Sequence, residues 1–96
     1  MKLNGELCDI LIIAHEDGRV SVAPDTLVVR LGQTVTWLVL GGTAVVYPAQ
    51  NIAAKFTLPS DQPVPRVVET PGPYCIVVTS IAGKKLGAMA VLIVDP

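Results

Sequence analysis

The sequence has few residues that could carry out chemistry. Its 96 residues include one histidine and two cysteines, and charged residues make up 16% of the chain, where soluble domains have roughly 25%. Two cysteines are too few for a scaffold held together by disulfides. The net charge is −1, and basic residues gather nowhere beyond Lys84-Lys85. This balance argues against nucleic acid and against an anionic membrane surface as partners.

Long apolar segments are absent as well. No run approaches the roughly 20 residues that a membrane-spanning helix requires, so no membrane span is predicted. Glu6 and Asp9 interrupt the segment in which a signal peptide would have its apolar core. As written, the chain is expected to be cytoplasmic, or else to be a mature domain whose leader has been removed.

What the chain does have is a series of short apolar stretches separated by turns. Hydrophobic residues make up 51% of it and aromatic residues 4%, so most are Val, Leu, Ile and Ala, which favour strands. Residues 43–68 contain four prolines and are expected to be irregular, apart from a helical turn near 51–55. The sequence predicts one all-β domain over residues 1–96, a sandwich of seven or eight strands. The extended segments expected are 7–14, 20–22, 27–31, 33–40, 56–58, 74–81 and 88–94.

Alternation along these segments predicts which side chains form the core, because successive residues of a strand point to opposite faces. The expected core comprises Cys8, Ile10, Ile12, Leu27, Val29, Val35, Trp37, Val39, Tyr74, Ile76 and Val78. The outward positions also carry large apolar residues, where a sheet facing water normally has polar ones. A partner or a second copy of the chain is therefore expected to cover them. The interface candidates are Leu11, Ile13, Val28, Leu38, Val77 and Ile81.

Two blocks of sequence carry a family resemblance. The first, residues 22–37, has a Pro before a strand, a Gly-Gln turn and Val-Thr-Trp opening the next strand. The second has Pro-Gly-Pro-Tyr at 71–74, and Gly87 leading the last strand at 88–94. In order and spacing these blocks resemble the two ends of the plastocyanin-like blue-copper proteins, the cupredoxins. The resemblance implies a cupredoxin-like Greek-key β-sandwich.

The resemblance also implies where copper ligands would lie. Cupredoxins bind copper through two His, one Cys and a weak axial Met, a ligand set that selects copper and tunes its potential. The first His would fall near 44–46, the Cys at 78, the second His near 81–83 and the Met at 85. The residues found there are Ala44, Val45, Val46, Val78, Ile81, Ala82, Gly83 and Lys85. We therefore predict a degenerate copper site, with no metal and no cofactor.

The remaining donors do not replace the missing ligands. Cys75 is three residues before Val78, so it is expected on the opposite face, and Met89 falls inside the last strand. His15 ends the first strand at a parity opposite to that of Cys8, and a metal site needs three or four convergent ligands. Both cysteines are expected to be unpaired thiols, Cys8 inward and Cys75 outward. No serine or carboxylate has a partner motif, so no catalytic residue is assigned.

Three roles remain open. The first is a metal-free binding, structural or self-assembly module that forms a homo-oligomer or binds a protein partner. The alternative is electron transfer or metal carriage with non-standard ligands, such as Cys75 or His15 at a subunit interface. The third is an enzyme or small-molecule binder that uses residues 43–68, although the chain is expected not to be an enzyme. A natural scaffold stripped of its ligands, or a designed sequence, would have these same features.

Overall fold

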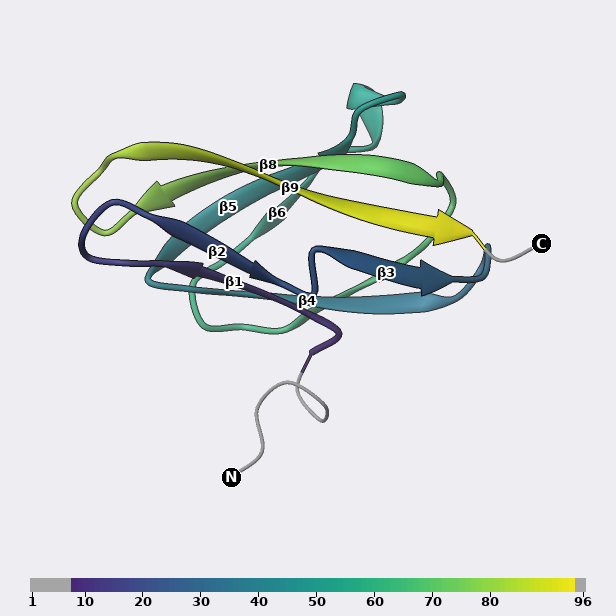
Figure 1. The fold of residues 1–96 in the computed structure, drawn as a ribbon, viewed down its shortest axis with the longest axis horizontal. Coiled ribbons are helices and arrows are strands. Elements are labelled where there is room, and N and C mark those ends of the chain that lie inside the picture. Colours follow the sequence, from purple (N-terminus) through teal and green to yellow (C-terminus); the bar gives the residue numbers. More distant parts are fainter. Residues whose placement is uncertain (1–7, 95–96) are drawn as a thin grey trace.

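The computed structural model of the protein describes residues 8–94. Across these residues the chain forms nine strands and one turn of 3-10 helix, arranged as two sheets that pack face to face (Figure 1). Within the same residues no helix is long and apolar enough to cross a membrane. The elements are β1 (Ile10–Ala14), β2 (Val20–Ala23), β3 (Thr26–Val29), β4 (Thr34–Leu40), β5 (Gly42–Pro48), η1 (Ile52–Ala54), β6 (Phe56–Leu58), β7 (Val64–Val67), β8 (Gly72–Ser80) and β9 (Lys85–Val94).

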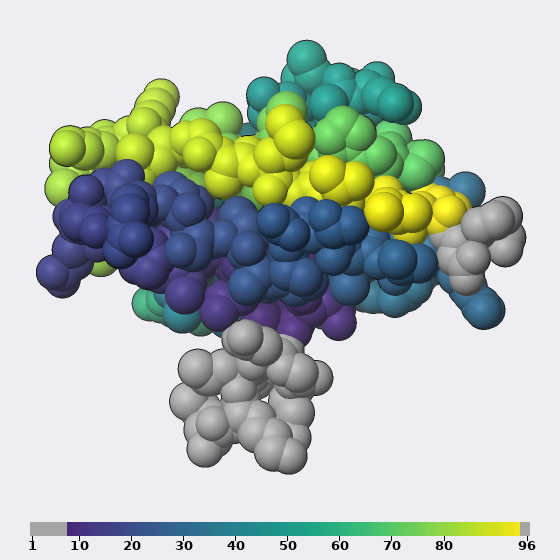
Figure 2. Space-filling view, viewed as in Figure 1, coloured from purple at the N-terminus to yellow at the C-terminus, as the bar shows by residue number. Residues whose placement is uncertain are grey.

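One sheet has four strands in the order β2-β1-β4-β7, and the other has five in the order β3-β9-β8-β5-β6. Most neighbouring strands are antiparallel, but β1 runs parallel to β4 and β3 runs parallel to β9. Consecutive strands such as β2 and β3, or β4 and β5, lie in different sheets, as in Greek-key sandwiches. β2 and β3 lie alongside β9 and close one edge of the sandwich (Figure 2).

The structure adds strands in the segment that the sequence predicted to be irregular. The chain reverses at Gly41 and continues directly into β5, seven residues long. The predicted strand 33–40 ends before the Gly41-Gly42 pair, and no strand was predicted to follow directly. In the structure Gly42 itself begins β5. β7 contains Pro65 and lies at the edge of its sheet, the position where a strand tolerates a residue without an N–H group. The helical turn and the short strand 56–58 are present as predicted.

The core between the sheets follows the predicted alternation. Val35, Trp37 and Val39 from β4 are at most 1% exposed and face the inward residues of β8 across the sandwich. Trp37 lies at the centre of an aromatic group, with ring centroids 5.5 Å from Phe56 and 5.8 Å from Tyr74. The two inner faces therefore form one continuous core, as sandwich packing requires.

Cys8 is the exception among the predicted core residues. It is buried, but it packs against Leu11 and Leu38 on the outer side of the four-stranded sheet and not in the main core. Alternation does not extend to this residue because the chain bends at Asp9 and β1 begins only at Ile10. Asp9 fixes that bend, since its N–H donates to the Thr36 carbonyl and its carboxylate accepts the Thr36 N–H, both at 2.8 Å.

Candidate functional site

The positions at which the resemblance would place copper ligands are part of the hydrophobic core. Ala44 on β5 lies directly opposite Val78 on β8, and these are the expected positions of the first His and the Cys. Their side chains are 2% and 0% exposed, and Val46 beside them is also fully buried. The strands thus bring the two positions together, but apolar side chains fill the space. The residues present do not fit a copper ion.

The connection between β4 and β5 leaves no loop that could present a ligand. Gly41 has a positive φ of 84°, which favours glycine, and a Cβ at this position would collide with the carbonyl group of Ala14. A Cβ on Gly42 would collide with the carbonyl oxygen of Thr79. The two glycines therefore let the backbones at the ends of β1 and β8 pack directly against the turn.

The connection between β8 and β9 is a closed turn. The Ser80 N–H donates to the Lys84 carbonyl and the Gly83 N–H to the Ser80 carbonyl, both at 2.8 Å, and the Ser80 hydroxyl accepts the Lys84 N–H at 3.1 Å. Ile81 projects from this turn and is 87% exposed. The expected positions of the second His, 81–83, are thus exposed positions of this turn, and the expected Met position, Lys85, is exposed at the start of β9.

The donors that remain in the chain are scattered. The ring Nε2 of His15 lies 2.7 Å from the Ser21 hydroxyl across the β1–β2 hairpin. Cys8 and Cys75 are free thiols, as predicted: Cys8 precedes β1 and packs on the four-stranded sheet, whereas Cys75 is on β8 of the other sheet. Burial raises the pKa of Cys8. Within residues 8–94 no three His, Cys, Asp or Glu side chains gather in a geometry that could hold a metal ion.

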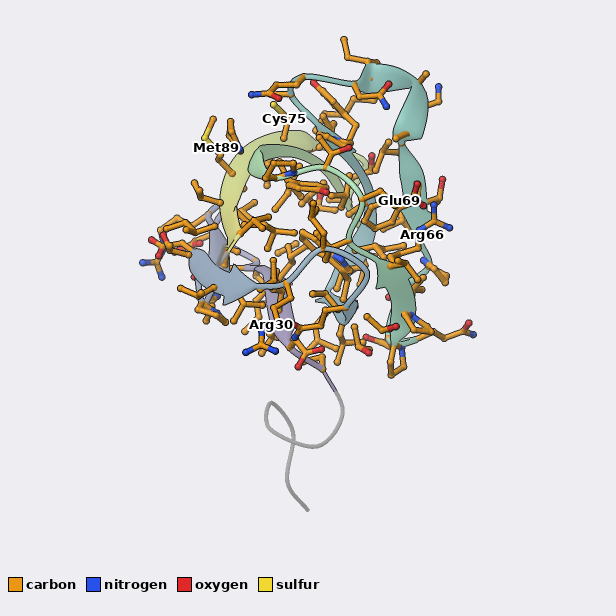
Figure 3. The ribbon with its side chains drawn as sticks, turned by 90° about the vertical axis from the view of Figure 1, so that its right-hand side faces the viewer. Arg30, Arg66, Glu69, Cys75 and Met89 are labelled. Atoms are coloured by element: carbon orange, nitrogen blue, oxygen red, sulfur yellow. The ribbon has the colours of Figure 1, made fainter. Side chains whose placement is uncertain are left out.

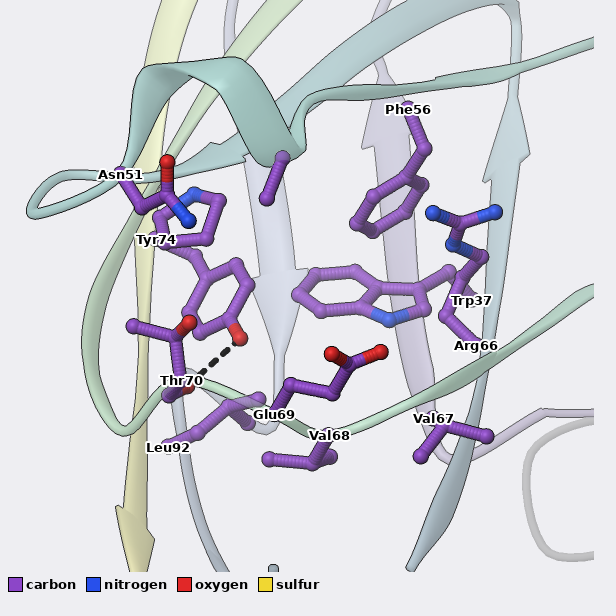
Figure 4. A pocket seen from close by; sticks show the side chains of 12 residues that line it. Trp37, Asn51, Phe56, Arg66, Val67, Val68, Glu69, Thr70, Tyr74 and Leu92 are labelled. Carbon is purple, nitrogen blue, oxygen red and sulfur yellow. Dashed lines mark hydrogen bonds between the residues drawn. The ribbon is translucent and has the colours of Figure 1, made fainter. Parts of the chain in front are cut away.

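A small cavity lies beside Trp37, in the part of the fold for which the sequence left a small-molecule role open (Figure 4). Its volume is about 100 Å³. The Arg66 guanidinium lies 4.8 Å from the centre of the Phe56 ring, and the Tyr74 hydroxyl donates to the Thr70 carbonyl at 2.6 Å. Small-molecule sites have roughly 300–1,000 Å³. The side chains here stabilise a corner of the sandwich and leave too little space for such a ligand.

A larger, open cavity of about 640 Å³ lies at the end of the sandwich where the connections β1–β2, β4–β5 and β8–β9 meet. His15, Glu16 and Gly18 line it from the first connection, and Ser80, Ile81, Ala82 and Lys84 from the last. The last connection contains positions 81–83, at which the resemblance would place the second His. The cavity volume would admit a small molecule, and Glu16 and Lys84 are among the residues that line it.

The outer face of the five-stranded sheet is apolar. Cross-strand rows place Tyr47, Cys75 and Met89 side by side, and Ile93 beside Val28. Cys75 and Met89 point away from the core on the same side of the molecule (Figure 3). We call this surface the outer apolar face, and its residues are Val28, Val45, Tyr47, Cys75, Val77, Met89, Val91 and Ile93.

Tyr47 on β5 lies directly opposite Cys75 on β8. Hydrogen bonding with the Cys75 side chain raises the pKa of the Tyr47 phenol. Met89 completes this row on β9 and is 54% exposed. Aromatic and sulfur side chains thus occupy the middle of the outer apolar face, and both types adapt well to a partner surface.

The six predicted interface residues lie on three different surfaces. Val28 and Val77 belong to the outer apolar face, and Ile81 lies at the β8–β9 turn. Leu11, Ile13 and Leu38 do face outward from the four-stranded sheet. However, Leu11 and Leu38 are only 7% and 5% exposed because they pack against Cys8, with Ile13 and Leu40 beside them. The expectation that all six are open to a partner is wrong for Leu11 and Leu38.

The sequence reasoning missed most of the outer apolar face. Val45 and Tyr47 were missed because β5 was not predicted. Met89, Val91 and Ile93 could have been found, since Ala88, Ala90 and Leu92 alternate with them as the inward set of β9.

Comparison with known proteins supports the fold. No protein-family model and no curated protein sequence matches the chain. A solved structure, "Novel Purple Cupredoxin from Nitrosopumilus maritimus", matches with a TM-score of 0.52 and 17% sequence identity, over 88% of this chain and 98% of that chain. The protein therefore has a cupredoxin-like fold, as the two sequence blocks predicted. At this identity the likeness establishes the fold alone.

Proposed function

We propose that this protein is a cupredoxin-like module that works without a metal, and that its role is to bind a protein partner or further copies of itself. The observation that carries the proposal is the pair Ala44 and Val78, which occupies the expected ligand positions as buried core. Copper sites of this kind need a thiolate and imidazoles at those positions. Closing the space with apolar side chains stabilises the sandwich and removes the redox centre.

A binding role without catalysis is supported by the outer surface. Monomeric soluble proteins rarely expose contiguous apolar patches beyond a few hundred Å², and larger patches mark interaction sites. Val28, Met89 and Ile93 are 62%, 54% and 47% exposed and lie on one face. His15 and Ser21 lie 2.7 Å apart, but this pair is exposed on the β1–β2 hairpin of the other sheet.

A copper titration followed by visible absorption tests the metal-free part of the proposal. We expect Cu(II) to give no intense visible band and to be lost on gel filtration, as measured by metal analysis of the protein fraction. A variant with both cysteines replaced by serine is the control, because it should behave like the wild type. An intense band with one equivalent of copper retained by the wild type and lost in the control would overturn the proposal.

Metal carriage is a second candidate, and one observation favours it. Cys75 and Met89 lie directly opposite each other on β8 and β9, so their sulfur atoms share one face. Thiolate and thioether are soft ligands that suit Cu(I). Competition for Cu(I) against a coloured chelator distinguishes the candidates. Removal of copper from the chelator by the wild type, and not by Cys75→Ser or Met89→Leu, would favour metal carriage over the metal-free role.

A further inference from the structure

We infer that two copies of this chain pack against each other through the outer apolar face, around a two-fold axis that passes near the middle of β8. The inference rests on the proposed binding role and names its partner as a second copy. In a two-fold interface the same patch of both copies meets, so the patch must be complementary to itself. The composition, size and charge of the outer apolar face each bear on this requirement.

The face has the layout of a protein interface, with an apolar centre and a polar rim. Val77 and Met89 at the centre are 36% and 54% exposed. Most other outward positions on the same five strands are threonines, together with one glycine, one lysine and one proline. These rim residues are Thr26, Thr43, Thr57, Pro73, Thr79, Lys85 and Gly87.

The size of the face is at the lower end of what a stable dimer needs. The strands β3, β9, β8, β5 and β6 contain 4, 10, 9, 7 and 3 residues, and at roughly 3.3 Å per residue and 4.8 Å between strands they cover about 520 Å². Two such faces together bury about 1,000 Å², the lower limit for a specific protein interface. The apolar rows from Val77 to Ile93 take up about half of the face, which leaves the rest as rim.

The charge on the face permits two identical copies to meet. Among the outward positions of β3, β9, β8, β5 and β6, Lys85 at the end of β9 is the single charged residue. Like charges therefore do not oppose each other at the centre, where their desolvation would be costly. A partner of strongly acidic or basic character would find no charge here to pair with, so a second copy suits this surface better.

Within residues 8–94 the other sheet offers no equivalent surface. Its outward apolar residues Leu11 and Leu38 are already buried, so covering them with a partner would remove little further area from water. On the five-stranded sheet η1 rises beside β5 and β6 (Figures 1 and 3), so the centre of the contact lies over β8 and not over those two strands. β8 is the central strand of that sheet, and Cys75 lies on its outer side.

Two valines provide matched variants for the test. Val77 lies at the centre of the outer apolar face, whereas Val67 lies on β7 of the other sheet and is 54% exposed. Light scattering after size exclusion should give twice the monomer mass of 10.1 kDa for the wild type. Val77→Lys should give the monomer mass, and Val67→Lys should remain a dimer. Trp37 fluorescence of each variant checks that the fold is intact.

Cys75 gives an independent readout in the unmodified protein. Its labelling by a maleimide should slow several-fold as protein concentration rises, while that of the buried Cys8, followed by peptide mass spectrometry, should not change. A short bismaleimide should yield a covalent dimer that Cys75→Ser abolishes. A wild type that stays monomeric at high concentration, or a Val67→Lys variant that dissociates like Val77→Lys, would overturn the inference. The absence of copper binding, measured separately, would still support the metal-free proposal.

Discussion

Truncation of Trp37 to alanine should be among the most destabilising single changes in this protein. The indole is 1% exposed, and its ring centroid lies 5.5 Å from Phe56 and 5.8 Å from Tyr74. Loss of a buried Trp costs roughly 3–5 kcal/mol in free energy of unfolding. Each aromatic neighbour adds about 0.5–1.5 kcal/mol beyond the area that it buries. We therefore expect a loss near the upper end, about 5 kcal/mol.

Such a loss approaches the whole stability of a small domain, which is roughly 5–15 kcal/mol. The assay is urea unfolding followed by far-ultraviolet circular dichroism, because Trp37 is the one tryptophan and fluorescence is lost with it. Leu31→Ala is the control, since Leu31 is 57% exposed and its truncation should cost less than about 0.5 kcal/mol. A loss below about 1 kcal/mol for Trp37→Ala would mean that the aromatic group does not anchor the core.

Two further predictions concern the turns and corners of the fold. Tyr74→Phe removes the hydrogen bond to the Thr70 carbonyl and should cost about 1 kcal/mol at neutral pH. Burial raises the pKa of Tyr74 above its usual value of 10.0, so the folded state keeps this proton longer than the unfolded state does. The stabilisation that comes from this raised pKa is complete below pH 10.0 and is lost as the pH rises above it. When the free energy of unfolding is measured at increasing alkaline pH, it should therefore fall less in Tyr74→Phe than in the wild type. If the free energy of unfolding falls equally with pH in both proteins, ionisation of Tyr74 does not cause the decline. Gly42→Ala should lower the free energy of unfolding, measured by urea titration, by roughly 1–3 kcal/mol because its Cβ meets the Thr79 carbonyl. Gly87→Ala, where the described residues leave open space, should change it by less than about 1 kcal/mol, and equal effects would contradict the packing argument.

Much of the fold could be predicted from alternation, because a sandwich strand has one face in the core and one face outside. β4 shows this well, since Val35, Trp37 and Val39 are buried as expected. β5 could not be predicted because Gly41 and Gly42 join two strands with almost no loop, a connection that depends on the backbones of β1 and β8 being close. The residues around Gly41 and Gly42 do not by themselves indicate that β1 and β8 lie close to this turn.

The candidate surface was harder to predict than the fold. The outward direction of Leu11 and Leu38 follows from alternation, but their burial depends on Cys8, whose own position is set by the bend at Asp9. The likeness to copper proteins indicated which positions to examine, and Ala44 and Val78 could be identified as non-ligands directly. Whether those positions formed an open site or a closed core required the three-dimensional structure.

The two-glycine connection between β4 and β5 has a consequence for protein engineering. Single substitutions at 44 and 78 would place polar side chains in a closed core, where an unpaired polar group costs free energy, and the short β4–β5 connection supplies no further ligand. Rebuilding a metal centre in this scaffold would therefore require grafting a longer connection in place of Gly41. The hairpin turns at Gly18 and Gly83 have open space around them within the described residues, so foreign loops should be accepted there first.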